Sequence, residues 1–176
     1  MRLFIAIDFN ELKNYFIELQ KLLPKDAKLS FTKSFHLTLK FLGEVQPNNV
    51  ANIVNTLKRI RFNSFSVFLD SIGVFPSESY IRVVWVGLNP EDKMLDLKNK
   101  IDESLNELFE KEKSFKTHIT LVRVKYLADK KYFLEQIKKI KVENKKVEIN
   151  NFRLIKSTLT PKGPCYEDLF IFTCEK

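Results

Sequence analysis

The sequence predicts an α+β fold with two lobes related by a pseudo-two-fold axis, mainly antiparallel sheets from each half facing a central groove, and helices outside. Two observations carry this prediction. A short sequence motif occurs twice, as His36-Leu37-Thr38-Leu39 and His118-Ile119-Thr120-Leu121. Paired extended runs at 65–88 and 146–173 suggest hairpins, which favour antiparallel over parallel sheet.

The first half of the chain alternates extended and helical patterns. Arg2 to Phe9 is predicted to be a strand, and Asn10 is expected to cap a helix that stops at Pro24. Residues 28–32 are a weaker strand candidate before the first motif strand, which ends at Gly43. Pro47 suits the first turn of a second helix. Two extended runs, 65–74 and 81–88, then form a predicted hairpin.

The second half repeats this order of elements. A helix is predicted from about Glu91 to Phe109, and the second motif strand begins near Thr117. Asp129 is expected to cap a further helix. Residues 146–156 and 166–173 are predicted to be two closing strands, joined by the turn at 161–164.

Size and composition limit the class of protein. A chain of 176 residues with 44% hydrophobic residues and 16 Phe can bury a substantial core and is not disordered. Because no Gly/Ser-rich linker separates the halves, residues 1–176 are expected to form a single two-lobed domain. The apolar runs are too short for a membrane span or a signal peptide, so we expect a cytoplasmic protein with no membrane partner. We also expect a monomer.

Charge and cysteine content are less specific. The net charge of +8 favours a polyanionic partner, although a solvated basic surface explains it equally well. The lysine-rich stretches 111–116 and 138–146 are open to the same two explanations. Cys165 and Cys174 are expected to be two buried thiols or, less often in the cytosol, a disulfide.

The two copies of the motif contain both histidines of the chain. Side chains alternate along a strand, so His36 shares a face with Thr38, and His118 shares a face with Thr120. Each motif strand therefore buries an aliphatic face and presents an imidazole and a hydroxyl on the other. The bland alternative is a pair of half-buried imidazoles, with threonine present for its β propensity.

Two imidazoles across a cleft can act as an acid and a base near neutral pH. In-line displacement at phosphorus needs that pairing, and threonine hydroxyls can donate to the non-bridging oxygens. The repeated motif contains no carboxylate, which argues against glycosidase or Mg²⁺ chemistry. With two His and two Cys, no zinc-finger spacing occurs. The prediction is phosphodiester chemistry on an anionic substrate without metal or cofactor.

These residues resemble a known family, the two-histidine (2H) phosphoesterases. Within it, they are most similar to the RNA 2′,3′-cyclic phosphodiesterases, also called 2′-5′ RNA ligases or LigT-like proteins. The resemblance covers most of the chain. Beyond the paired His-x-Thr-Leu motifs it includes the segments 1–7, 36–44, 73–76, 84–87 and 157–166 and the residue Arg123.

The resemblance implies a bilobal hydrolase that converts RNA 2′,3′-cyclic phosphate ends to 2′-phosphomonoesters without metal. It implies that His118 is the general base and His36 the general acid, and that Thr38 and Thr120 hold the phosphate. Family members have also been linked to the joining of tRNA halves through a 2′-5′ bond, which we treat as a secondary activity in RNA processing.

Arg123 lies five residues after His118, so strict alternation would send it to the opposite face. The phosphate-binding role that the resemblance implies for Arg123 requires the strand to end or bulge first. Lys40 is expected on the face of His36, where it either adds charge or is solvated.

Two positions depart from the family pattern. Thr117 stands where proline commonly precedes the second histidine, and Phe31 lies near a common tryptophan position. Tyr166 and Phe9 are candidate partners for base stacking.

Two other functions remain open from the sequence. One is a phosphodiesterase of small cyclic or 2′-5′ linked nucleotides, which a narrow groove would favour. The other is a non-catalytic RNA-binding domain, in which the histidines would be far apart or buried. The separation of the two imidazoles distinguishes these classes.

Overall fold

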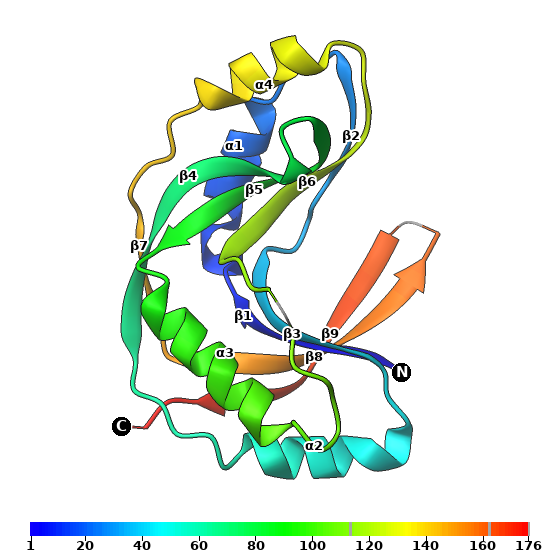
Figure 1. Cartoon of the computed structure of the whole chain (residues 1–176), viewed down its shortest axis with the longest axis vertical. Coiled ribbons are helices and arrows are strands. Elements are labelled where there is room, and N and C mark those ends of the chain that lie inside the picture. The colour runs from blue at the N-terminus through cyan, green and yellow to red at the C-terminus, as the bar shows by residue number, and fades with distance from the viewer. Residues whose placement is uncertain (113, 162, 176) are drawn as a thin grey trace.

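The computed structural model describes residues 1–112, 114–161 and 163–175; Lys113 of the first lysine-rich stretch and Lys162 of the closing turn lie outside them. Two curled antiparallel sheets face one another, and four α-helices flank them among the described residues (Figure 1). The predicted α+β class is therefore confirmed. No helix in the described ranges is long and apolar enough to span a membrane.

Sheet A has the strand order β3-β1-β8-β9, and sheet B has the order β2-β6-β5-β4-β7. The strands of sheet A are β1 (Arg2–Asp8), β3 (His36–Glu44), β8 (Asn151–Thr160) and β9 (Gly163–Thr173). The strands of sheet B are β2 (Ala27–Phe31), β4 (Phe65–Ser77), β5 (Tyr80–Asn89), β6 (His118–Leu127) and β7 (Lys146–Ile149). The expected hairpins correspond to β4–β5 and β8–β9.

Each sheet contains strands from both halves of the chain, so the lobes interlock. The single strand expected over 146–156 is wrong, because the chain leaves sheet B at Ile149 and enters sheet A at Asn151. The buried positions change phase there, from Val147 and Ile149 to Phe152 and Leu154. This odd-to-even change coincides with the change of partner, from β4 before Asn150 to β1 and β9 after it.

The helices cover the outer sides of the sheets, as predicted (Figure 1). They are α1 (Lys13–Lys21), α2 (Val50–Leu57), α3 (Asp92–Ser104) and α4 (Lys130–Lys138); the short 3₁₀ turns Asn10–Leu12 and Pro47–Asn49 precede α1 and α2. Asp129 caps α4 by accepting a hydrogen bond from the Tyr132 N–H, as predicted. Asn10 does not cap α1; its side-chain oxygen instead accepts from the Phe35 N–H, which fixes the entry to β3.

The main hydrophobic core is one contiguous cluster that includes residues of both sheets and of all four α-helices. A second, small apolar cluster lies on the inner face of sheet A and consists of Phe4, Ala6 and Ile155, with Tyr166 packed against it. Cys165 and Cys174 are free thiols, as the first of the two expectations had it, but they are not buried: Cys165 is exposed and Cys174 is half-buried.

Candidate active site

Both motif strands contain a β-bulge at the same place. In β3, Thr38 pairs with Ala6 and Lys40 pairs with Ile5, so Leu39 is the extra residue. In β6, the corresponding extra residue is Leu121, between the paired positions Thr120 and Val122. A bulge leaves one residue unpaired and reverses the alternation of side chains beyond it.

The bulge determines the orientation of Arg123. Without it, the fifth residue after His118 would point to the core. With it, Arg123 pairs with Val83 on the inner face and is exposed there, on the same face as His118 and Thr120. The bulge that a phosphate-binding role of Arg123 requires is therefore present in β6.

The matching bulge in β3, at Leu39, turns Lys40 away from His36. Lys40 is 1% exposed, and its ammonium forms an ion pair with Asp102 at 2.6 Å and donates to the Glu110 carbonyl at 2.7 Å. Asp102 also pairs with Lys98 at 2.6 Å. Burial opposes the ionisation of Asp102, but the two lysines outweigh it and lower the pKa of the carboxyl group. The expectation that Lys40 shares the face of His36 is wrong, and its role is structural.

His118 begins β6, and its tautomer follows from one hydrogen bond. Its Nδ1 lies 2.7 Å from the carbonyl oxygen of Lys116. A carbonyl oxygen only accepts, so Nδ1 carries the hydrogen and donates it. In the neutral ring, Nε2 is then left with a lone pair. Burial, followed by Arg123 and Lys116, lowers the pKa of His118, and the hydrogen bond to the Lys116 carbonyl only partly offsets this.

Two aromatic rings brace His118 on sheet B. Phe75 meets it edge-on at 4.8 Å between ring centroids, and Trp85 lies at 6.2 Å. Trp85 reaches this position because Gly73 has no side chain. A Cβ at Gly73 would overlap the indole carbons Cζ2 and Cη2. Neither aromatic residue was singled out from the sequence as a site residue.

The segment before His118 is tied to the start of α3. Thr117 is buried, and its hydroxyl lies 2.6 Å from Oε1 of Glu91 and 3.3 Å from the Leu88 carbonyl oxygen. Lys116 also bonds Glu91, at 3.0 Å. Hydrogen bonds from Thr117 and Lys116 lower the pKa of Glu91. These bonds hold the strand entry where the family commonly has proline, and so fix the Lys116 carbonyl that orients His118.

His36 begins β3 on the inner face of sheet A, in contact with two aromatic rings. Phe4 lies at 5.0 Å and Tyr166 at 5.2 Å between ring centroids. Burial, and then the positive charges of Arg123 and His118, lower the pKa of His36 from 6.5 to about 4. Burial also raises the pKa of Tyr166, and Arg123 opposes this.

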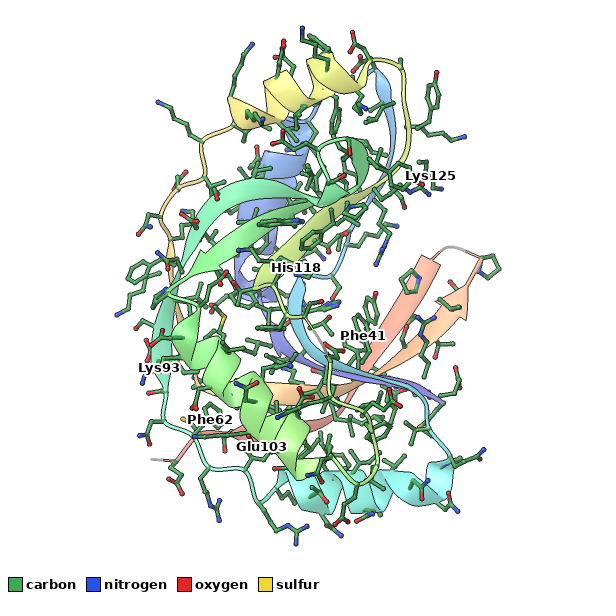
Figure 2. All side chains as sticks on the ribbon, in the orientation of Figure 1. Phe41, Phe62, Lys93, Glu103, His118 and Lys125 are labelled. Atoms are coloured by element: carbon green, nitrogen blue, oxygen red, sulfur yellow. The ribbon has the colours of Figure 1, made fainter. Side chains whose placement is uncertain are left out.

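The two halves of the site meet because β3 and β6 lie against one another, one from each sheet. His118 and Arg123 both act electrostatically on His36, although they belong to the opposite sheet. Thr38 and Thr120 are half-buried, each on the face of its own histidine. Figure 2 labels His118 between the two sheets. The structure thus places His36, His118 and Arg123 close enough to interact, and it puts Thr38 and Thr120 on the faces of their own histidines.

A pocket of about 250 Å³ opens beside His36 on sheet A. Its other lining residues are Asp8, Asn10, Ser34, Arg153, Ile155, Tyr166 and Asp168. Arg153 holds this end of the sheet together by pairing with Asp168 at 2.6 Å and with Asp8 at 3.3 Å. The pocket is polar and continuous with the imidazole of His36.

The remaining aromatic residues considered from the sequence lie in different places relative to the site. Phe9 is fully buried, so its expected role in stacking is wrong. Phe31 pairs with Val122, which is a buried position, whereas its neighbour Ser30 pairs with Arg123. The ring of Phe31 is nevertheless 51% exposed, so the register alone neither buries it nor brings it to the site. Tyr166 remains a site neighbour.

Fold, repeated motif and paired imidazoles together define a phosphoesterase built from two similar halves. The chain belongs to the LigT-like phosphoesterase family, whose sequence model matches residues 7–85 and again residues 86–166. The RNA 2′,3′-cyclic phosphodiesterase of Methanocaldococcus jannaschii is 38% identical over 171 residues, covering 95% of this chain and 97% of the relative. That of Archaeoglobus fulgidus is 36% identical over 184 residues, covering 98% and 99%.

Solved structures show the same fold. The Thermus thermophilus protein TT0787 superposes with a TM-score of 0.82 at 27% identity, over 98% of this chain and 97% of that one. Escherichia coli LigT complexed with 3′-AMP gives a TM-score of 0.78 at 26% identity, over 99% and 98%.

Proposed function

We propose that this protein hydrolyses RNA 2′,3′-cyclic phosphate ends to 2′-phosphomonoesters. The observation that carries the proposal is the meeting of two imidazoles, one from each sheet, within the field of a single arginine. The names of the curated relatives support the substrate class. The 3′-AMP complex of E. coli LigT supports a site for a nucleotide.

His118 is proposed as the general base. Its Nδ1 is committed to the Lys116 carbonyl, so Nε2 is the atom that takes a proton. Because its pKa is lowered, the ring is neutral at pH 7 and can accept. Water attacks the phosphorus as Nε2 removes its proton.

His36 is proposed as the general acid. As the bond between phosphorus and O3′ breaks, His36 gives its proton to O3′, leaving a 3′ hydroxyl and a 2′-phosphomonoester. A pKa of about 4 is low for a general acid at neutral pH, but two of its three causes are the positive charges of Arg123 and His118. A bound phosphodiester anion offsets those charges and raises the pKa of His36 toward its ordinary value.

Arg123, Thr38 and Thr120 are proposed to bind the phosphate. A guanidinium can donate two parallel hydrogen bonds to two non-bridging oxygens. The two hydroxyls are neutral donors, each on the face of its own histidine. Donors aimed at charge that develops in the transition state contribute roughly 3 kcal/mol each when the site excludes water.

The direct test is incubation with an oligonucleotide that ends in a 2′,3′-cyclic phosphate, in the presence of EDTA. We expect conversion to a 2′-phosphomonoester, identified by ³¹P NMR. A 3′-phosphate product, or loss of activity on chelation, contradicts the mechanism. Alanine at either His36 or His118 should lower kcat by at least ~100-fold, the smaller end of the general acid–base contribution.

The acid and base roles can be separated with a better leaving group. A p-nitrophenyl phosphodiester releases p-nitrophenolate, which needs no proton. His36→Ala should therefore lose much less activity on this substrate than on the cyclic phosphate, whereas His118→Ala should lose as much on both. The opposite pattern would exchange the two roles.

The finer expectations remain predictions. We further propose that the protein joins tRNA halves as a secondary activity, that it is a monomer, and that residues 1–176 form a single two-lobed domain. The contiguous core that includes residues of both sheets supports the single domain. A phosphodiesterase limited to small nucleotides would fail to act on the oligonucleotide. A non-catalytic RNA-binding domain would bind it without product.

A further inference from the structure

An aromatic surface extends from His36 along the inner face of sheet A. Phe4 touches the imidazole and also lies 5.5 Å from the ring of Tyr166. Phe41 lies 6.3 Å from Phe4 and is 63% exposed, so its ring forms the outer end of this surface. In Figure 2 the labelled Phe41 lies over sheet A on the side that faces sheet B.

Phe41 occupies in β3 the position that Arg123 occupies in β6. Each is the fifth residue after its histidine, and each is returned to the inner face by the matching bulge. The pseudo-symmetric site therefore has a cation at one end and an exposed aromatic ring at the other. The N–H of Phe41 donates to the Glu112 carboxylate at 3.2 Å. Its backbone donor is thus occupied, and the ring is the group that Phe41 offers to a partner.

A cation lies beyond the ring. Arg2 is exposed and shares the inner face with Phe4, two residues further along β1. Its neighbour across the strands, Glu44, is paired with the amino terminus at 3.3 Å, which offsets the charge of that carboxylate. From His36 outward, the surface therefore runs from imidazole to aromatic rings to guanidinium. Interleaved rings and cations are the usual features of sites for single-stranded nucleic acid.

The terminal nucleoside has its own space elsewhere. The polar pocket beside His36 lies toward Asp8 and Arg153, whereas Phe41 lies the other way along β3. At ~3.3 Å per residue, the three residues from Thr38 to Phe41 correspond to at most ~10 Å. This distance is suited to the next nucleotide of an extended strand rather than to the reacting one.

We propose that Phe41, supported from below by Phe4, stacks on the base of the nucleotide that precedes the cyclic-phosphate end, with Arg2 beside the backbone of that nucleotide. This inference rests on the proposed function. It adds that the enzyme binds the preceding nucleotide as well as the terminal nucleoside. Stacking of a base on an aromatic side chain does not depend on which base it is. The preference is therefore for chain length and not for sequence.

The test compares a mononucleoside 2′,3′-cyclic phosphate with a dinucleotide ending in the same cyclic phosphate. The wild type should have the higher kcat/KM on the dinucleotide. Phe41→Ala should lower the ratio of the two kcat/KM values roughly tenfold, within the range measured for loss of one stacked base, mainly through the KM of the dinucleotide. Phe41→Trp should restore the ratio, because it restores a stacking face.

Phe170→Ala is the matched control. Phe170 is also an exposed phenylalanine of sheet A, at 41%, but it pairs with the buried Leu154 and lies under Lys58, the residue that follows α2, on the helix side. This variant should leave the ratio unchanged.

Three results would overturn the inference while leaving the proposed function intact. One is a wild type with no preference for the dinucleotide. Another is an equal loss on both substrates in Phe41→Ala. The third is a wild-type dimer that Phe41→Ala converts to monomers, which would assign the ring to a second copy of the chain. If the wild type hydrolyses neither substrate, the proposed function itself fails, and the inference fails with it.

Discussion

Replacing Arg123 by glutamine should raise the pKa of His36. In the wild type that pKa is lowered from 6.5 to about 4, first by burial and then by the charges of Arg123 and His118. Arg123→Gln removes a full positive charge on the facing sheet but leaves the backbone and the bulge in place. The imidazole stays half-buried among Phe4 and Tyr166, so only part of the shift should be recovered.

The size of the effect follows from the order of these causes. The difference between 6.5 and about 4 corresponds to roughly 3 kcal/mol of discrimination against the protonated ring. Burial is the largest cause, so the charge of Arg123 accounts for less than half of it. The pKa of His36 in Arg123→Gln should therefore rise but stay below about 5.5. Inorganic phosphate, which brings negative charge between the histidines, should raise the wild-type value in the same direction.

Proton NMR is the assay, and the chain is well suited to it because it contains only two histidines. His118→Gln assigns the two Cε1 proton signals. If His36 in the wild type titrates at or above 6.5, the buried environment described here is wrong. If Arg123→Gln leaves the pKa unchanged, the guanidinium does not face His36, and its phosphate role loses its geometric basis.

The lowered pKa also has a consequence for stability. The folded state binds the His36 proton more weakly than the unfolded state does. The contribution is therefore fully present above pH 6.5 and is lost as the pH falls toward about 4, by at most roughly 3 kcal/mol. Urea denaturation across this range should show a smaller loss in His36→Gln, and equal losses would contradict the assignment.

Three further predictions concern the supports of the site. The pH profile of kcat/KM should be bell-shaped with its maximum below 6.5, because the pKa values of both histidines are lowered in the free protein; a maximum above pH 7.5 would contradict this. Asp102→Asn leaves two buried ammonium groups without their counterion, so the free energy of unfolding from urea titration should fall by ~3–5 kcal/mol; a loss under ~1 kcal/mol would mean that the lysines are solvated. Gly73→Ala must displace Trp85 and disturb His118, so kcat should fall roughly 10- to 100-fold with little change in global stability, and Gly87→Ala, whose added Cβ meets the same indole only at 3.3 Å, should be milder.

Local patterns were sufficient for much of the architecture. Period-two runs and turn residues located both hairpins, and Asp129 was recognised as a helix cap because capping depends only on near neighbours. Two matching strand motifs were enough to expect that His36 and His118 face a common groove. The copies also contained an unused signal: aligning them places Phe41 opposite Arg123.

The bulges were only partly visible in the chain. In β6 the apolar positions change phase, from Ile119 and Leu121 to Val122 and Val124, whereas in β3 the buried Lys40 and the exposed Phe41 hide the same change. Pairing with β1 and β5 shows that Leu39 and Leu121 are the extra residues. That one-residue offset turned Lys40 into the core and brought Arg123 to the site.

The amino-acid sequence by itself determined which side chains are candidates for the chemistry, because residue type and a repeated motif are local properties. Tertiary structure alone decided how the two sheets exchange strands, which ring nitrogen of His118 is free, and how far the pKa of His36 falls. These depend on strand partners, a neighbouring carbonyl and facing charges that are distant along the chain. Electrostatic fields and strand register are set by distance in space, and only the fold creates those distances.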